Sequence, residues 1–264
     1  YSTQAMLDLS YAYYLSNQKD DAIVAVNRFI RLYPNHPEVA YAFYLRALAN
    51  FDKDANVLTR FFAYDPSRYD VSALKESFND FSIVVNQYPN SKYADDSINR
   101  LVYIKNQIAR NELYIARYYR KRSAHVAAIE RVKYMLENYG GTPSTEEGII
   151  ILIDSYNDLG MEDMAYDSAR VLKKNYPAYK ISKSGNKVTV SKVQEETNTA
   201  TSKEKGSSNG PITDNAEYEK AKAVLTAPVI AIDNFFAGLT SSSASQGSDT
   251  VVTFTAGTGT VSFS

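Results

Sequence analysis

A Tyr-Pro pair recurs along the chain, and each copy ends a stretch with apolar side chains at helical spacing. A proline cannot continue a helix, because it lacks the N–H group and its ring clashes with the preceding turn. A helix stop repeated in this way predicts stacked helical hairpins. The copies are Tyr33-Pro34, Tyr88-Pro89 and Tyr176-Pro177, with a degraded copy at Tyr139-Gly140.

The first hairpin is expected over residues 3–33. Apolar spacing predicts one helix from Thr3 to Leu15, and the acidic pair Asp20-Asp21 opens a second helix that ends at Tyr33. Registered on Pro34, this hairpin matches the tetratricopeptide (TPR) repeat of about 34 residues. The predicted core positions are held by Leu9, Tyr13, Ala22 and Val26, with Met6 in place of the usual Trp and Ser10 in place of the usual Gly.

Further helices follow the same pattern along the chain. We expect them over residues 38–51, 72–88, 93–121, 124–139, 148–159 and 161–176. Before the helix at 148, Ser144 and Glu147 match a capping box, with Ser144 as the N-cap. The sequence therefore predicts an all-α fold, a TPR-like α-solenoid of helical hairpins over residues 1–177, followed by a largely irregular C-terminal extension.

An insertion breaks the regular spacing of the hairpins. Residues 52–71 exceed one repeat and contain the clusters Arg60-Phe61-Phe62 and Tyr64-Asp65-Pro66. We expect a long ordered loop or a short helix between the two helices of one hairpin. Long insertions in compact domains are often functional, and a loop that only packs against its own repeat is the alternative.

The composition changes at about residue 178. Beyond Pro177 the chain is rich in Ser, Thr, Gly, Lys and Asn, and it contains no arginine. We expect a low-complexity linker over residues 178–215, in which Gly185-Asn186 turns one short β-hairpin. Residues 216–264 are expected to form an apolar helix up to Leu239, which needs a partner surface, and a tail that either adds a strand to a neighbour or is disordered.

Composition also argues against several classes of function. Lys and Arg total 29 and Asp and Glu total 30, so net charge gives no reason to expect nucleic acid as a partner. The absence of cysteine excludes disulfides and thiolate metal ligands. His36 and His125 both lie at expected helix starts, and no catalytic or nucleotide-binding motif is present. We therefore expect neither an enzyme, nor a cofactor, nor a metal site.

A superhelix of hairpins offers a concave face lined by the first helix of each hairpin. Such a face suits an extended or helical peptide, and binding surfaces favour tyrosine because its ring is large and apolar and its tip is polar. Packing of neighbouring units over some of these side chains is the alternative. The TPR register points the following residues toward this face: Gln4, Tyr11, Tyr14, Tyr41, Tyr44, Arg100 and Tyr103.

The residues between the helix stops carry a family resemblance over roughly Tyr1 to Pro177. Asp80-Phe81-Ser82, followed by Tyr88-Pro89-Asn90-Ser91 and Asn99-Arg100-Leu101-Val102, resembles the BamD family of outer-membrane assembly lipoproteins, also called ComL or YfiO. Further matching segments are Asn27-Arg28-Phe29-Ile30-Arg31-Leu32 with Pro34 and His36-Pro37, Ile108-Ala109-Arg110 with Glu112, and Ala116, Tyr118-Tyr119, Arg122 and Ala127-Ala128.

The resemblance implies a non-catalytic scaffold of the β-barrel assembly (BAM) complex, on the periplasmic face of the Gram-negative outer membrane. It implies that the N-terminal units recognise the C-terminal signal of unfolded outer-membrane proteins. It further implies that the C-terminal units hold the POTRA domain of a BamA-type barrel-forming subunit, with other BAM lipoproteins as neighbours. Arg131 matches the family position that pairs with an acid on that subunit, and an ordinary helix-surface arginine is the alternative.

The sequence departs from the family pattern in two respects. Members have a signal peptide, a lipidated cysteine and a first TPR unit. This sequence opens at Tyr1, inside an expected helix, so we expect it to begin at the second unit, without the lipid anchor. The tail beyond Pro177 has no counterpart in the family pattern. A general TPR peptide-binding adaptor of the cell envelope is the main alternative function, and an enzyme acting on peptidoglycan is a more distant one.

Overall fold

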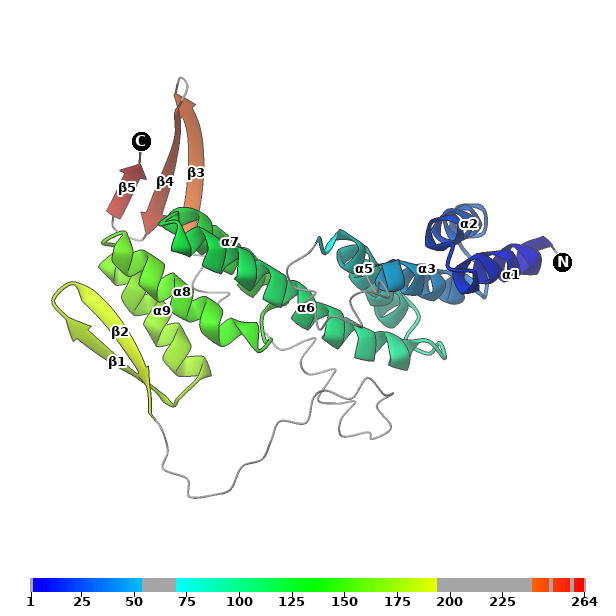
Figure 1. The fold of residues 1–264 in the computed structure, drawn as a ribbon, viewed down its shortest axis with the longest axis horizontal. Coiled ribbons are helices and arrows are strands. Elements are labelled where there is room, and N and C mark those ends of the chain that lie inside the picture. Colours follow the sequence, from blue (N-terminus) through cyan, green and yellow to red (C-terminus); the bar gives the residue numbers. More distant parts are fainter. Residues whose placement is uncertain (1, 54–69, 194–238, 247–248, 257–258, 264) are drawn as a thin grey trace, which may run out of the picture. The chain divides into compact units, whose positions relative to one another are not determined.

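The computed structural model describes residues 2–53, 70–193, 239–246, 249–256 and 259–263 (Figure 1). Within these ranges the chain is mainly helical, and consecutive helices pack in pairs, which confirms the predicted all-α, TPR-like class. None of the described helices is long and apolar enough to cross a membrane. The helices are α1 (Ser2–Leu15), α2 (Lys19–Leu32), α3 (Val39–Lys53), α5 (Ser72–Gln87), α6 (Ala94–Lys121), α7 (His125–Tyr139), α8 (Ser144–Asp158) and α9 (Glu162–Asn175).

The described chain divides into two compact units. The first unit comprises the described residues up to Tyr114, and the second unit begins at Ile115, within the long helix α6. Each unit contains its own packed helices. In the first, α1 packs on α2, α2 on α3, and α3 on α5, whereas in the second α7 packs on α8 and α8 on α9.

The Tyr-Pro pairs form one local structure three times. Tyr33, Tyr88 and Tyr176 are the C-caps of α2, α5 and α9, and each donates its backbone N–H to a carbonyl in the last turn of its helix. Each tyrosine carbonyl then accepts the N–H of the residue three positions later, at 3.0 to 3.1 Å. The proline therefore occupies the second position of a β-turn, where its fixed φ is favoured.

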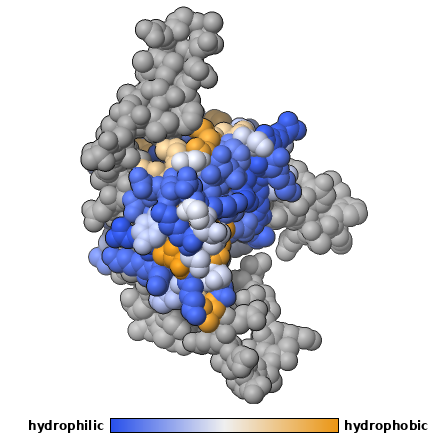
Figure 2. Space-filling view, turned by 90° about the vertical axis from the view of Figure 1, so that its left-hand side faces the viewer, coloured by the Kyte–Doolittle hydropathy of each residue, from blue (hydrophilic) through white to orange (hydrophobic). Residues whose placement is uncertain are grey.

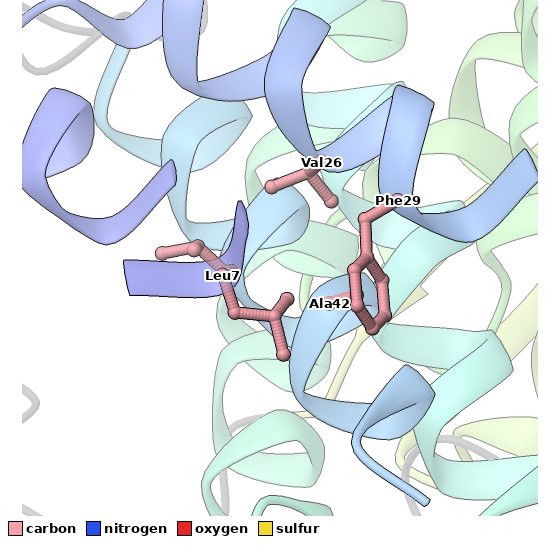
Figure 3. Close-up of a cluster of buried hydrophobic side chains, with 5 residues drawn as sticks. Leu7, Val26, Phe29 and Ala42 are labelled. Atoms are coloured by element: carbon pink, nitrogen blue, oxygen red, sulfur yellow. The ribbon is translucent and has the colours of Figure 1, made fainter. Parts of the chain in front are cut away.

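The core of the first unit is a small cluster of apolar side chains from three helices (Figure 3). Leu7 of α1, Val26 and Phe29 of α2, and Ala42 and Leu45 of α3 are each at most 1% exposed. Figure 3 shows the ring of Phe29 beside Ala42, whose short side chain leaves room for it. Full burial of a side chain such as Leu7 or Phe29 stabilises the fold by about 1.5–3 kcal/mol.

A buried ion pair joins three helices of the first unit. Arg46 of α3 donates Nε–H to Asp80 Oδ2 at 2.7 Å and Nη2–H to Asp80 Oδ1 at 2.5 Å. Its Nη1–H reaches Asn27 Oδ1 of α2 at 2.5 Å. The Asp80 side chain is 5% exposed, and burial raises the pKa of its carboxyl while Arg46 opposes the shift. Arg46 therefore connects α2, α3 and α5.

The second unit is packed just as closely. Val132 and Met135 of α7 and Leu152 of α8 are at most 2% exposed. Gly148 of α8 lies where a Cβ atom would come within 2.4 Å of the Met135 Cε methyl. The missing side chain of Gly148 thus lets α7 and α8 approach each other.

A β-hairpin follows α9, as the sequence predicts. Strands β1 (Tyr179–Ser184) and β2 (Lys187–Lys192) pair antiparallel, and the positive φ of 59° at Gly185 fits the first central position of a type II′ turn. Asn157 of α8 clamps β2, because its Oδ1 accepts the Val188 N–H at 2.9 Å and its Nδ2–H donates to the Val188 carbonyl at 2.7 Å. The hairpin is therefore a fixed part of the second unit.

The C-terminal segment contains three further strands that pair with one another. Strands β3 (Leu239–Gln246), β4 (Asp249–Ala256) and β5 (Gly259–Phe263) form an antiparallel sheet in the order β3-β4-β5. The sequence offered a strand added to a neighbour or a disordered tail, whereas these strands pair with one another. The apolar helix expected from residue 216 lies outside the described residues, and Leu239 belongs to β3.

Two local expectations are wrong, and a third lies outside the described residues. Leu9 was assigned to the core and is 50% exposed, because Leu7 and Ser10 form the buried face of α1. The capping box is wrong, since α8 begins at Ser144 after Pro143 without a side-chain cap, and Thr145 Oγ1 instead accepts the Thr142 N–H at 3.2 Å. The inserted segment, apart from the end of α3 and the residues from 70 onward, lies outside the described residues.

Candidate functional site

The residues predicted to line a peptide-binding face all lie in the first unit. We call this set the tyrosine surface: Gln4, Tyr11 and Tyr14 of α1, Tyr41 and Tyr44 of α3, and Arg100 and Tyr103 of α6. Tyr11 and Tyr14 stack with ring centroids 6.3 Å apart. Tyr11 also acts electrostatically on Tyr41, and Tyr44 acts on Tyr14, so the tyrosines of α1 and α3 are neighbours.

Tyr14 is held by a carboxylate and a lysine. Its hydroxyl donates to Asp52 Oδ2 at 2.5 Å, and Lys19 Nζ lies 3.6 Å above its ring and 3.8 Å from the same oxygen. Burial, and then the bond to Asp52, holds the pKa of the Tyr14 phenol well above its usual value. Tyr14 is therefore a fixed, neutral donor whose ring also accepts a cation–π contact.

Tyr44 repeats this arrangement with arginine in place of lysine. Its hydroxyl donates to Asp96 Oδ2 at 2.7 Å, and Arg100 donates Nε–H to the same oxygen at 2.6 Å. The Arg100 guanidinium lies 5.2 Å from the centre of the Phe51 ring and 5.9 Å from that of Phe81. Burial, and then Asp96, raises the pKa of the Tyr44 phenol, so this tyrosine is also a neutral donor.

Tyr93 connects the tyrosines of α3 to the start of α6. Its ring stacks on Tyr44 at 4.8 Å and lies 5.3 Å from the Tyr41 ring. Burial, with Tyr93 as the next cause, raises the pKa of Tyr41 to about 12. Tyr93 therefore joins the two tyrosines of α3 to the start of α6.

Only part of the tyrosine surface is open to a ligand without rearrangement. Tyr11 is 44% exposed, and Tyr103, whose ring meets Phe51 at 5.8 Å, is 38% exposed. Gln4 is exposed and donates to Asp8 of its own helix at 2.9 Å. Tyr14, Tyr41, Tyr44 and Arg100 are half-buried and each presents only part of its side chain.

Sequence reasoning missed the carboxylates that hold these tyrosines. Asp96 precedes Arg100 by four residues on α6, a spacing that places both on one helix face and is visible in the sequence. Asp52 gave no comparable signal, because it lies at the predicted start of the insertion. Lys19, the first residue of α2, likewise carried no sequence signal for a site.

Arg131 lies in the second unit, on the exposed face of α7. Tyr134 follows one turn later on the same helix and is 37% exposed. An exposed arginine beside an exposed tyrosine is a combination enriched in protein interfaces. The side chain of Arg131 is therefore accessible from solvent.

Both histidines have roles at helix starts, as expected. His36 Nδ1 accepts the N–H of Glu38 at 3.1 Å, and its ring meets Phe29 edge-on. His125 is the first residue of α7, with Nδ1 3.6 Å from Asp158 Oδ2. Within the part of the chain that the structure describes, no three His, Asp or Glu side chains gather as a metal site would require.

Comparison with known proteins places the chain among outer-membrane proteins. Residues 1–202 match the model of the YfiO family, described as outer membrane lipoprotein. Relatives named outer membrane protein assembly factor BamD include those of Neisseria meningitidis serogroup A, 40% identical over 177 residues, and Xylella fastidiosa strain Temecula1, 38% identical over 177 residues. The match covers 67% of this chain and 66% and 60% of those two relatives, so the chain spans somewhat less than two thirds of their length. The Haemophilus influenzae relative is 35% identical over 175 residues, which is 66% of this chain and 67% of that protein.

Proposed function

This chain belongs to the YfiO family of outer membrane lipoproteins, and we propose on this premise that it is a non-catalytic scaffold in the assembly of outer-membrane β-barrel proteins. The name of its relatives, outer membrane protein assembly factor BamD, supports the proposal. The protein works at the periplasmic face of the outer membrane, in agreement with the family description, outer membrane lipoprotein. Its partners are unfolded barrel proteins, a barrel-forming subunit with a POTRA domain, and the other lipoproteins of the complex.

The tyrosine surface binds the unfolded barrel protein in this proposal. The observation that carries it is the repeated Tyr–Asp–cation arrangement, in which Tyr14 and Tyr44 are each fixed by a carboxylate. Fixed aromatic side chains lose little conformational entropy on binding, so they favour contact with an extended polypeptide. The exposed Tyr11 and Tyr103 extend this surface toward solvent.

Affinity for a barrel-protein peptide tests the substrate role. Tyr11→Ala and Tyr103→Ala each remove an exposed ring, and we expect either to weaken binding of a C-terminal strand peptide about tenfold. Tyr166→Ala is the matched control, because Tyr166 of α9 is 46% exposed and Tyr11 is 44% exposed. If Tyr11→Ala and Tyr166→Ala weaken peptide binding equally, the tyrosine surface is not the substrate site.

Arg131 holds the barrel-forming subunit in this proposal. An exposed guanidinium offers a planar pair of donors to a carboxylate on the partner. Arg131→Glu reverses the charge and should abolish recovery of the POTRA domain in a pulldown. Arg170→Glu is the control, since Arg170 is an exposed arginine of α9 in the same unit. Equal recovery with Arg131→Glu and the native chain refutes this role.

The same pulldown distinguishes the general TPR adaptor. An adaptor of the cell envelope binds peptides at the tyrosine surface but has no specific need for a barrel-forming partner. Recovery of diverse envelope proteins without a POTRA-bearing subunit therefore favours the adaptor over the assembly scaffold.

A further inference from the structure

The second unit contains a polar cavity of about 590 Å³, lined by residues of α6, α7 and α8 and of the turn between α6 and α7. This volume lies in the range of small-ligand sites. Ile151 is the only aliphatic side chain among the described residues of its lining, and most of these residues are charged or can become so. Figure 2, which views the molecule from the side of α8, α9 and the β1–β2 hairpin in Figure 1, shows mainly hydrophilic residues on the described part of the face toward the viewer. A polar ligand suits such a cavity.

Basic side chains from α6 and the start of α7 supply donors to the cavity. They are Arg117, Arg120, Lys121 and His125. Arg117 donates two hydrogen bonds to the carboxylate of Glu147 of α8. Arg120 Nη2 lies 2.6 Å from Asp154 Oδ2 of the same helix. The arginines are therefore held in place by α8.

Three nitrogens of this group have no hydrogen-bond or ion-pair partner among the described residues. The Nε atom of Arg120 and the Nδ1 atom of His125 are buried and make no hydrogen bond. The carboxylate nearest to His125 Nδ1, on Asp158, is 3.6 Å away, beyond hydrogen-bond distance. Lys121 is exposed and forms no ion pair with any described residue. Buried polar atoms without partners are rare, and a ligand that accepts hydrogen bonds satisfies them.

The cavity also presents hydrogen-bond acceptors. Glu147 and Asp158 of α8 line it, and ionised carboxylates only accept. Ser123, in the turn before α7, adds a hydroxyl. A ligand that carried only negative oxygens would be repelled by Glu147 and Asp158. A ligand with an oxyanion at one end and hydroxyl donors at the other matches both sets of groups.

We propose that this cavity binds a phosphorylated polyol. Its phosphate accepts from Arg120, Lys121 and His125, and its hydroxyls donate to Glu147 and Asp158. A phosphate offers three strong acceptor oxygens, which matches the three nitrogens without partners better than a carboxylate with two oxygens. A glycerophosphate group has this chemistry, and it occurs both as a free polyol phosphate and as the headgroup of a glycerophospholipid.

Calorimetric titration with sn-glycerol 3-phosphate at low ionic strength tests the site. We expect saturable binding of one molecule per chain, with inorganic phosphate weaker because it brings no polyol hydroxyls. Lys121→Gln removes the cation that forms no ion pair and should weaken binding about tenfold without loss of fold. Lys174→Gln, at an exposed lysine in the last turn of α9, should leave binding unchanged. No saturable binding, or equal weakening by both variants, overturns the proposal.

Vesicle flotation separates the two sources of the ligand. If the ligand is a headgroup, the chain floats with phosphatidylglycerol vesicles but not with phosphatidylcholine vesicles. In that case sn-glycerol 3-phosphate competes with the vesicles for the chain. Of the two lysine variants, only Lys121→Gln prevents flotation. If the ligand is a soluble polyol phosphate, the chain binds in the calorimeter and does not float. Flotation that both lysine variants reduce equally, with no binding in the calorimeter, shows only general attraction to an anionic surface and contradicts the site.

Discussion

In each unit an arginine meets a carboxylate through two parallel hydrogen bonds, and the two pairs differ in burial. In the first unit the side chains of Arg46 and Asp80 are 22% and 5% exposed. In the second unit those of Arg117 and Glu147 are 47% and 46% exposed. Both pairs have the same hydrogen-bond geometry, so their difference in burial decides how much each contributes to the free energy of unfolding. The first pair is buried among three helices, whereas the second joins α6 to α8 where both side chains are open to solvent.

The same contrast extends to the aromatic residues. In the first unit the tyrosine hydroxyls of Tyr14 and Tyr44 are bonded to aspartates inside the surface they form. In the second unit Tyr179 of β1 also donates to a carboxylate, that of Glu146, and Lys192 bonds the same oxygen. Tyr179 is 7% exposed, whereas Tyr14 and Tyr44 belong to a surface that also presents the exposed Tyr11 and Tyr103. The first unit therefore presents an aromatic surface that the arrangement in the second unit does not match.

The largest expected effect is the loss of the buried pair. Asp80→Asn removes the charge that balances Arg46, and we expect a loss of about 3 kcal/mol in the free energy of unfolding. Urea denaturation followed by circular dichroism measures it. Exposed ion pairs contribute up to about 1 kcal/mol. A loss below this value would show that burial does not make the Arg46–Asp80 pair more stabilising than the Arg117–Glu147 pair.

A smaller loss is expected from the tyrosine hydroxyl that is bonded to Asp96. Tyr44→Phe removes a hydrogen bond to a charged group, so we expect a loss of about 1.5 kcal/mol in the free energy of unfolding. Tyr156→Phe is the control, because Tyr156 is 4% exposed and its hydroxyl makes no hydrogen bond to any described residue. If Tyr156→Phe lowers the free energy of unfolding as much as Tyr44→Phe does, the comparison of the two units is contradicted.

The exposed pair of the second unit should contribute less. Glu147→Gln leaves Arg117 in contact with water, so the free energy of unfolding should change by no more than about 1 kcal/mol. The same denaturation experiment detects it. A loss as large as that of Asp80→Asn would contradict the difference drawn between the pairs.

The smallest effect is a dependence on acid pH at the β1–β2 hairpin. Tyr179 and then Lys192 bond the Glu146 carboxylate at 2.6 and 2.9 Å and hold its pKa below the ordinary value of 4.5. The lowered pKa contributes stability that is present above pH 4.5 and is lost as the pH falls through the pKa of the folded state. Tyr179→Phe should therefore lose less stability than the native chain between neutral pH and pH 3, measured as the shift in thermal midpoint. Parallel pH profiles for the two proteins would contradict this assignment.

The helices were predictable from the sequence because local rules decide where they stop. Proline after Tyr33, Tyr88 and Tyr176 ends each helix, whatever the rest of the chain does. The Gly185-Asn186 turn was predictable for the same reason, since Gly readily adopts positive φ.

The candidate sites depended on contacts that no local pattern encodes. Asp52 reaches Tyr14 from 38 residues away, and Asp80 reaches Arg46 from 34 residues away. The capping box failed because Thr145 bonds the turn before α8, while Glu147 bonds Arg117 of α6. Tertiary partners thus took the place of local ones. The polar cavity of the second unit combines α6, α7 and α8 and had no sequence signal of its own.

Site-specific photo-crosslinking tests the central claim, that the fixed aromatic surface of the first unit binds unfolded barrel protein. A photoreactive amino acid placed at Tyr11 or Tyr103 reports on the first unit, and one at Tyr166 or Tyr134 reports on tyrosines of similar exposure in the second. With an unfolded outer-membrane protein as substrate, we expect strong crosslinks from positions 11 and 103 and background from 134 and 166. Equal yields at all four positions, or yields confined to the second unit, would contradict the account.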